Sequence, residues 1–463
     1  MFEEKMMNPL PEAYVRQMKR LLGEAGFFAY ERALQEPAAR ALRVNLLLCP
    51  DGVPPCPIEG LEGAVPWCRG AYFVAEGARP GLSPLHEGGL YYLQEPSTLS
   101  AVTALDPQPG ERILDLCAAP GGKSTQIAAR MGGRGLLVCN EPVQSRAQIL
   151  SRNVERMGVT NAVVTSAMPD QLAARFPAFF DRILADAPCS GEGMFRRQAE
   201  ARDEWSENVP RGCAERQMDI LRHAAKMLAP GGVMVYSTCT FNDTENEGVL
   251  ARFLAEHGEF ELRPFALPGL PPAPEGYVHL YPHVVRGEGH FVSLLAKRAS
   301  AQAAGELTRT AASAKGAGRP ARAAKGKETP APALPEGVLA PGVSFKRPYP
   351  SGDKLWALPE GIDMDALSGV RVLRSGLLLA HAEGRRMEPD HALAMALRPE
   401  QAARCAALTR EQALAYQAGE ALDLGDRPNG YTLLTYEGVS LGFGKQAGGI
   451  MKNHYPKGLR RRS

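Results

Sequence analysis

One stretch decides the fold of this 463-residue chain: Arg112-Ile113-Leu114-Asp115-Leu116-Cys117-Ala118-Ala119-Pro120-Gly121-Gly122-Lys123-Ser124-Thr125. It begins as an apolar run of strand length and passes through a Pro-Gly-Gly turn into residues that can start a helix. Two later stretches, Ile183–Gly191 and Tyr236–Thr240, also carry polar residues just past an apolar run. Ligands bind at the carboxyl edge of an open parallel sheet. We therefore expect the three stretches to meet at one site.

Strand-like and helix-like runs alternate from about residue 106 to residue 297. This alternation predicts an α/β fold, a doubly wound and mostly parallel Rossmann-like sheet. We expect the segment Leu228–Gly232 to end a helix and form a turn, because it contains Pro230 and two glycines. The expected strands are 112–116, 135–140, 162–166, 182–186, 233–237 and 291–296, and the expected helices are 124–131, 143–157, 215–228 and 244–257.

Three regions flank this central domain, which we place at residues 101–299. Residues 1–100 combine helical spacing with a short strand at Arg43–Leu46, so we expect a small α+β module and a connector. Residues 300–335 hold six Lys and Arg against two Glu and have no aromatic residue, which is typical of a flexible basic linker. Residues 336–463 return to short apolar runs joined by glycines and predict one or two α+β modules.

Composition narrows the class of protein. Hydrophobic residues at 44% and charged residues at 22% are typical of a soluble globular protein. A net charge of +2 means that any basic patch is local. The spacing of the nine cysteines matches no disulfide scaffold, and no signal peptide or membrane-spanning run is visible. We therefore expect a cytoplasmic protein that does not bind a membrane. Cys49, Cys56 and Cys68 match no zinc spacing, and we expect no metal.

The glycine turn excludes two nucleotide motifs and favours a third kind of site. A phosphate loop requires a glycine where Cys117 stands, and the Gly-x-Gly-x-x-Gly fingerprint is absent. What remains is a backbone that can approach a ligand, with a helix N-terminus that can bind a carboxylate. Glu141, past the second strand, can accept hydrogen bonds from ribose hydroxyls. These features suit S-adenosylmethionine.

Two cysteines follow separate strands at the same expected edge, Cys189 and Cys239. Methylation of a pyrimidine at ring carbon 5 requires a thiolate to add first at ring carbon 6, which is ordinary covalent catalysis. Asp186, protonated or sharing a proton with ring nitrogen 3, would offset the charge that builds on the ring. Lys123 would hold Asp186 or help to ionise the thiol. The residues alone do not rank the two cysteines.

Three blocks, Asp115–Lys123, Asp186–Gly191 and Ser237–Thr240, together resemble the RNA 5-methylcytosine methyltransferases of the Sun-type (NSUN) family. The resemblance covers roughly residues 94–297. It implies that Cys239 is the nucleophile and that Cys189 assists release of the methylated base. It also implies S-adenosylmethionine as cofactor. The residues implied to bind it are Cys117, Ala118, Ala119, Pro120, Gly121, Gly122, Lys123, Glu141 and Asp186.

The flanks resemble parts of the same family. Arg43-Val44-Asn45 is similar to a substrate-binding signature in the N-terminal module of the family. The segment Lys452–Arg460 resembles the C-terminal end of proteins in the bacterial ribosomal RNA small subunit methyltransferase F group. The implied substrate is a cytidine of 16S ribosomal RNA, in naked RNA or in the 30S subunit, flipped out of its stack. The expected RNA contacts are Arg43, Asn45, Lys452, His454, Lys457 and Arg460.

Some questions stay open from the sequence. After the third strand the family usually has an acidic or amide residue for the adenine, whereas this chain has Ser166-Ala167-Met168, with Asp170 as a candidate. Transfer RNA is an alternative substrate, and a catalytically inactive RNA-binding protein is an alternative function. We expect a monomer, because the active site is self-contained.

Overall fold

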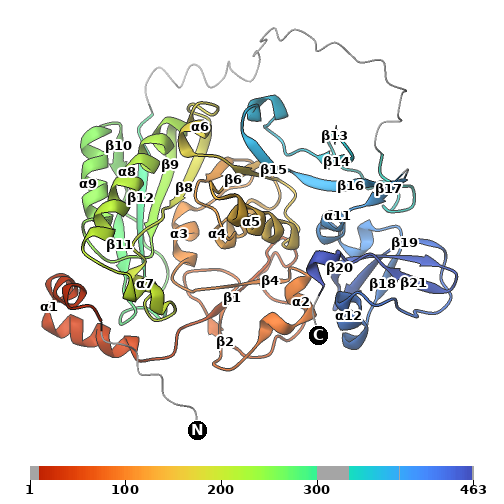
Figure 1. The fold of residues 1–463 in the computed structure, drawn as a ribbon, viewed down its shortest axis with the longest axis horizontal. Helices are drawn as coiled ribbons and strands as arrows, with labels where there is room; N and C mark the ends of the chain where they lie inside the picture. Colours follow the sequence, from red (N-terminus) through yellow and green to blue (C-terminus); the bar gives the residue numbers. More distant parts are fainter. Residues whose placement is uncertain (1–9, 300–332, 385, 461–463) are drawn as a thin grey trace, which may run out of the picture.

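The computed structural model of the chain describes residues 10–299, 333–384 and 386–460. A nine-stranded sheet forms its centre, in the order β10-β12-β9-β8-β5-β6-β7-β15, with β11 paired to β12 (Figure 1). The strands of this sheet are β5 (Arg112–Asp115), β6 (Leu136–Asn140), β7 (Ala162–Ser166), β8 (Phe180–Asp186), β9 (Leu228–Thr238), β10 (Phe260–Leu262), β11 (Tyr277–Leu280), β12 (His290–Lys297) and β15 (Arg371–Ser375).

The five strands from β9 to β7 run parallel, and the strands beyond them on either side are antiparallel. The chain moves from β5 outward through β6 and β7 and then returns to β8 on the other side of β5. This reversal creates a switch point at the carboxyl end of β5, where α/β sheets bind ligands. The predicted doubly wound, mostly parallel sheet is confirmed.

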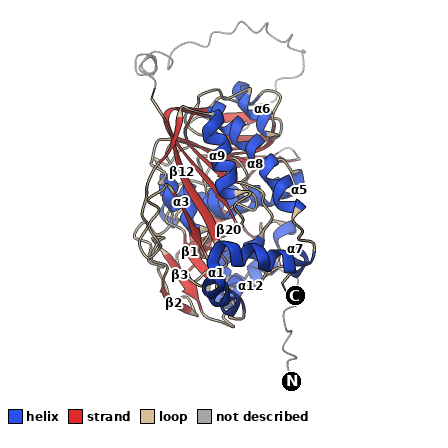
Figure 2. Ribbon diagram, turned by 90° about the vertical axis from the view of Figure 1, so that its left-hand side faces the viewer, coloured by secondary structure: helices blue, strands red, loops and turns tan. Residues whose placement is uncertain are grey.

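Helices cover both faces of the sheet (Figure 2). One face packs against α3 (Leu99–Leu105), α4 (Gly122–Met131) and α5 (Gln144–Arg156). The other face packs against α6 (Pro169–Ala173), α8 (Asn208–Met227) and α9 (Asn246–Glu256). Because side chains alternate along a strand, Leu184 faces the first layer while the neighbouring Ile183 faces the second.

The predicted elements of this domain are found with shifted ends. Helix α8 begins seven residues earlier than predicted, since Pro210 is tolerated in the first turn of a helix. The prediction of a turn at Leu228–Gly232 is wrong, although the helix does end at Met227. The segment is the start of β9, and Gly231, with a φ of 79°, lies where the pairing with β8 shifts register.

The N-terminal region places one helix, α1 (Glu12–Leu34), beside a four-stranded sheet in the order β2-β3-β1-β4. Residues of α1 share a core with Phe195, Trp205 and Phe241 of the central domain. The strands are β1 (Ala41–Val44), β2 (Leu61–Ala64), β3 (Ala71–Val74) and β4 (Tyr91–Gln94), and short helices are α2 (Pro84–Glu87) and, in the central domain, α7 (Ala199–Asp203). The predicted strand at Arg43–Leu46 therefore begins and ends two residues earlier.

The C-terminal region forms two four-stranded sheets, of order β13-β14-β16-β17 and β18-β19-β20-β21, with helices α11 (His391–Ala396) and α12 (Arg410–Ala418). Strand β15 belongs to neither of these sheets. It pairs with β7 of the central sheet, which the sequence did not predict. Residues 300–332 of the predicted basic linker lie outside the described residues. The strands are β13 (Pro348–Ser351), β14 (Lys354–Ala357), β16 (Leu377–Glu383), β17 (Arg386–Pro389), β18 (Cys405–Ala407), β19 (Gly430–Tyr436), β20 (Val439–Ala447) and β21 (Ile450–Asn453).

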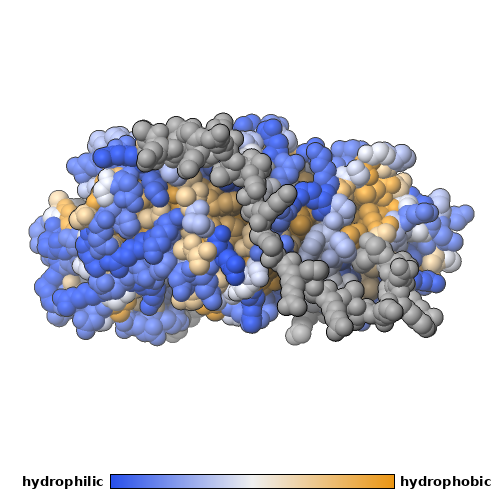
Figure 3. All heavy atoms as spheres, turned by 90° about the horizontal axis from the view of Figure 1, so that it is seen from above, coloured by the Kyte–Doolittle hydropathy of each residue, from blue (hydrophilic) through white to orange (hydrophobic). Residues whose placement is uncertain are grey.

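Seen from above, the described surface is mostly hydrophilic, with apolar residues gathered at the centre and over part of the C-terminal region (Figure 3). Among the described residues, no helix combines the length and apolar character that a membrane span needs. The same residues contain no cluster of three or more His, Cys, Asp or Glu side chains arranged to hold a metal ion.

Candidate active site

Strand register brings the polar residues of three stretches to one face of the sheet. Asp186 of β8 is paired with Ser237 of β9. Each follows, two residues later, a side chain that packs against the layer containing α4, namely Leu184 and Val235. Side chains two apart on a strand share a face. Asp115 follows Ile113 in the same way on β5. The carboxyl ends of β5, β8 and β9 therefore present their polar side chains toward the start of α4.

Asp186 is held by two donors. Lys123, in the first turn of α4, donates from Nζ to Oδ2 at 2.8 Å, and the Ser237 hydroxyl donates to Oδ1 at 2.8 Å. Burial alone would raise the pKa of Asp186, but Lys123 and His290 outweigh it and hold this pKa below its ordinary value. The carboxylate is therefore ionised before a substrate binds.

The two predicted cysteines lie together: the Sγ atoms of Cys189 and Cys239 are 3.3 Å apart, and neither is in a disulfide. The hydrogen bond with Cys239 raises the pKa of Cys189, and burial and the charge of Glu245 raise it further. Cys189 is therefore a protonated thiol that can donate to the sulfur of Cys239. The fold therefore brings the two predicted cysteines into contact.

A buried carboxylate that sequence reasoning missed fixes both cysteine loops. Glu245 is fully buried and accepts hydrogen bonds from the Ser190 hydroxyl at 2.5 Å, from Asn242 at 2.8 Å and from Gln217 at 2.6 Å. Ser190 also pairs with the Thr240 hydroxyl at 2.6 Å. Since Ser190 follows Cys189 and Thr240 follows Cys239, this network sets the spacing of the two sulfur atoms. A glutamate at the start of a helix gave no sequence signal of burial.

The glycine turn lies beside two further carboxylates. Gly121, with a φ of 114°, precedes α4 and lets the chain turn sharply into the helix. Asp115 is fully buried and accepts from Ser124 at 2.6 Å, while its Oδ1 has no partner among the described residues. Glu141 is 3% exposed, accepts from the Val143 amide at 3.0 Å and lies 3.4 Å from Arg146.

Comparisons with known proteins identify the group. Family models match the chain at residues 10–96 (N-terminal domain of 16S rRNA methyltransferase RsmF), 102–296 (16S rRNA methyltransferase RsmB/F), 339–397 (RsmF rRNA methyltransferase first C-terminal domain) and 403–461 (methyltransferase RsmF PUA domain). Ribosomal RNA small subunit methyltransferase F of Enterobacter sp. (strain 638) is 34% identical over 473 residues, covering 97% of this chain and 95% of that protein. The chain belongs to the RsmB/F family. The protein of the same name from Aliivibrio fischeri is 33% identical and covers 97% of each chain.

Solved structures agree with this membership of the RsmB/F family. A methyltransferase homologue from Pyrococcus horikoshii has a TM-score of 0.52 at 28% identity, covering 62% of this chain and 95% of that chain. NSun6 of the same organism, solved with SFG, has a TM-score of 0.54 at 20% identity, covering 63% of this chain and 99% of that chain, and is similar in fold. The family resemblance read from the three blocks is confirmed.

Two predicted RNA contacts of this RsmB/F member, Arg43 and Asn45, are buried in the structure. Arg43 is 2% exposed and donates to the Gly122 carbonyl at 3.2 Å and the Thr125 hydroxyl at 2.8 Å. Asn45 is 1% exposed and donates to the carbonyls of Gly89 and Met157, each at 3.0 Å. Arg43 makes both bonds with Nη2, and its Nε and Nη1 have no partner among the described residues. The bonds of Arg43 and Asn45 join the N-terminal sheet to the central domain.

Of the four predicted RNA contacts near the C-terminus, two are exposed and two are partly covered by neighbouring residues. Lys452 of β21 and Lys457 are exposed. His454 lies 3.4 Å from Glu388, and burial lowers its pKa, so it is neutral at pH 7. The side chain of Arg460 packs over Gly419, and its Nε is buried. Lys452 and Lys457 therefore remain the better placed of the four for contact with phosphates. Asp170, the adenine candidate, is exposed in the first turn of α6.

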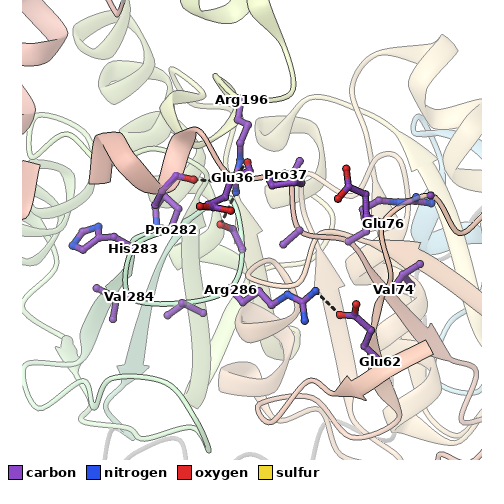
Figure 4. A pocket seen from close by; sticks show the side chains of 17 residues that line it. Glu36, Pro37, Glu62, Val74, Glu76, Arg196, Pro282, His283, Val284 and Arg286 are labelled. Carbon is purple, nitrogen blue, oxygen red and sulfur yellow. Dashed lines mark hydrogen bonds and ion pairs between the residues drawn. The ribbon is translucent and has the colours of Figure 1, made fainter. Parts of the chain in front are cut away.

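A cavity of about 540 Å³ lies between the N-terminal sheet and the loop that leads to β12 (Figure 4). Its three arginines already have partners: Arg40 donates to Ala78, Arg196 to Glu288, and Arg286 pairs with Glu62. Each arginine is therefore held by a partner inside the protein, and neither cysteine of the pair lines the cavity.

Proposed function

We propose that this protein transfers a methyl group from S-adenosylmethionine to carbon 5 of a cytidine in 16S ribosomal RNA. The observation that carries the proposal is the pair of thiols 3.3 Å apart beside Asp186 and Lys123, at the switch point of the sheet. Membership of the RsmB/F family supports ribosomal RNA as the substrate class.

The groups around the two cysteines differ, and they support Cys239 as the nucleophile. Burial would lower the pKa of Lys123, but Asp186 and then Cys239 raise it, so Lys123 is an ammonium whose charge acts on Cys239. Cys189 instead lies near Glu245, which favours its protonated form. Cys239 then attacks ring carbon 6, and Cys189 is placed to assist release of the product.

The residues at the glycine turn fit the proposed cofactor. The unpartnered and buried Oδ1 of Asp115 suits the ammonium of its amino-acid tail, and the backbone of Cys117 to Gly122 at the start of α4 suits its carboxylate. Glu141 suits the ribose hydroxyls. When bound, S-adenosylmethionine supplies an electrophilic methyl group, and the protein residues hold it against the pyrimidine.

RNA recognition is assigned to the flanking parts of the chain. We assign residues 101–299 to methyl transfer, residues 1–100 to support of the site and RNA recognition, and residues 336–463 to RNA binding, with the segment 300–335 as a basic linker between them. Lys452 and Lys457 are the proposed phosphate contacts, which would position the RNA without reading its sequence.

The decisive experiment compares two substitutions with tritiated S-adenosylmethionine and unmodified 16S ribosomal RNA. Cys239→Ala is expected to abolish methyl transfer, because no sulfur can add to the ring, while cofactor affinity stays unchanged. Cys189→Ala is expected to accumulate a protein–RNA adduct that resists denaturant. Turnover by Cys239→Ala would refute the assignment of Cys239 as the nucleophile. Absence of the adduct would refute the role of Cys189 in product release.

Bisulfite sequencing of RNA from cells with and without the protein identifies the substrate. Loss of 5-methylcytosine from 16S ribosomal RNA is the expected result, whether naked RNA or the 30S subunit is modified. Loss confined to transfer RNA would overturn the substrate class. No change in any RNA would favour an RNA-binding protein without catalysis.

A further inference from the structure

His290 lies at the active-site edge on a strand that sequence reasoning treated only as framework. It is the first residue of β12, and Phe291 after it is paired with Thr238 of the antiparallel β9. Continued by one position, this register would place His290 opposite Cys239, the residue that follows β9. His290 also shares the face of Val292, which is the face that carries Asp186.

Three loops meet around this position. The Gly193 amide donates to the Cys239 carbonyl at 2.8 Å. A Cβ added at Gly193 would lie 3.0 Å from that carbonyl oxygen and 3.1 Å from the carbonyl oxygen of Gly289. Gly193 therefore packs against both the backbone before His290 and the loop of the proposed nucleophile.

The imidazole of His290 is buried without a hydrogen-bond partner. The residue is 1% exposed, and neither ring nitrogen forms a hydrogen bond with the described residues. Its Nε2 lies 3.4 Å from Asp186 Oδ1, a contact that is long and poorly directed for a hydrogen bond. Buried polar groups are normally paired. An unpaired one beside a catalytic carboxylate indicates that a ligand completes the site.

The groups around His290 define which ligand edge fits. Burial lowers the pKa of His290, and Lys123 lowers it further, against the opposite effects of Asp186 and Glu95. The ring is therefore neutral and has one N–H to donate. Lys123 and Ser237 already donate to Asp186. Asp186 is then an acceptor, and His290 is the donor next to it.

Cytosine presents the complementary pattern on its Watson–Crick edge, an amino donor at position 4 next to an acceptor at ring nitrogen 3. We propose that His290 is a substrate-contacting residue whose Nε2–H donates to ring nitrogen 3 of the flipped cytosine, while Asp186 accepts from the exocyclic amino group. This inference rests on the proposed function and deepens it, since it assigns the reading of the base to two residues.

The contact would strengthen during the reaction. When the Cys239 thiolate forms its bond to ring carbon 6, the electron pair of the 5,6 double bond shifts and negative charge reaches ring nitrogen 3. The electron pair returns when carbon 5 takes the methyl group, and the donor sulfur keeps the electrons of the broken bond and leaves as a neutral thioether. Carbon 5 then loses its proton to solvent water, the 5,6 double bond forms again, and the Cys239 sulfur leaves as thiolate. A donor aimed at ring nitrogen 3 therefore stabilises the transition state more than the bound substrate.

The same pair explains rejection of uracil. Uracil carries a carbonyl oxygen at position 4 and an N–H at ring nitrogen 3, the reverse of cytosine. Its carbonyl oxygen would face the Asp186 carboxylate, and its N–H would face the N–H of His290. Buried polar groups left unpaired or opposed give strong discrimination.

The test compares His290→Phe, which removes the N–H and keeps a ring, with His290→Gln, which keeps a donor near Nε2. At saturating 16S ribosomal RNA, His290→Phe is expected to lower kcat by about 100-fold, as for loss of one transition-state donor, and to slow adduct formation in the Cys189→Ala background equally. KM for RNA and affinity for S-adenosylmethionine are expected to change little. His290→Gln is expected to keep kcat within about tenfold of the wild type.

Two results would overturn the inference: wild-type kcat in His290→Phe, or an equal loss in His290→Gln and His290→Phe. His223→Phe serves as control, because His223 lies on α8 and bonds the Asp219 carbonyl away from the site. Unchanged cofactor affinity and thermal midpoint show that the Phe variant is folded. Absence of methyl transfer by the wild type would instead refute the proposed function.

Discussion

Asp115 shows how burial can prepare a single side chain for a charged ligand. Burial raises the pKa of this carboxyl to about 7, against the hydrogen bond from Ser124, which lowers it. Its Oδ1 stays unpartnered. A cationic group placed against Oδ1 would return the pKa toward its ordinary value. Cofactor binding and ionisation of Asp115 should therefore be coupled.

Asp115→Asn tests this coupling. Between about pH 4 and pH 7 the unfolded chain loses the Asp115 proton while the folded chain keeps it, so wild-type stability falls with rising pH. Each pKa unit corresponds to about 1.4 kcal/mol. The Asn variant lacks this loss, and its thermal midpoint should rise relative to the wild type across this window. Its affinity for S-adenosylmethionine should fall at least about tenfold, which is one such unit. A constant difference in midpoint between pH 4 and pH 7 would contradict the assignment.

At the scale of elements, β15 shows a connection that no local pattern encodes. This strand extends the central sheet, and Arg374 on it pairs with Glu155 of α5. The next residue but one, Gly376, has a φ of 117°, and the chain then enters β16 of a different sheet. A Cβ at Gly376 would lie 2.3 Å from the carbonyl oxygen of Ala357. The turn between the sheets therefore requires glycine.

Gly376→Ala is expected to lower the free energy of unfolding by at least about 2 kcal/mol more than Gly110→Ala. Both glycines have a positive φ, so each substitution costs about 1–2 kcal/mol in backbone strain. Only Gly376 adds a steric clash, since a Cβ at Gly110 has no atom within 4 Å. Urea unfolding measures the difference, and equal losses would mean that the β15–β16 turn relaxes freely.

The difference between local patterns and contacts across the chain explains which features the sequence could predict. Mostly apolar runs such as Ala162–Ser166 were predicted correctly as strands, and Asp186, Cys189 and Cys239 lie at or just past the ends of such strands. Lys123 lies in the first turn of the helix that follows one of them. The burial of Arg43 and Glu245, and the position of His290 beside Asp186, depend on segments far apart in the chain. No periodicity in their own segments distinguishes them from surface residues.

At the scale of the molecule, the N-terminal sheet and the C-terminal sheets act on the site differently. Arg43 reaches from β1 to Gly122 and Thr125 of α4, the helix that carries Lys123. Burial lowers the pKa of its guanidinium to about 10, which leaves it charged at pH 7. It therefore supports the cofactor turn from inside. Lys452 and Lys457, in contrast, lie exposed at the far end of the chain.

This difference predicts that only the exposed lysines affect the salt dependence of RNA binding. The double variant Lys452→Ala and Lys457→Ala should bind 16S ribosomal RNA more weakly, with the slope of log affinity against log salt reduced by about 1.4–1.8, because two phosphate contacts are lost. Its affinity for S-adenosylmethionine should not change. Arg43→Ala should weaken cofactor binding and lower the thermal midpoint, and its salt slope for RNA should equal that of the wild type. A reduced slope in Arg43→Ala would return Arg43 to the RNA interface, and an unchanged slope in the lysine variant would remove the C-terminal region from it.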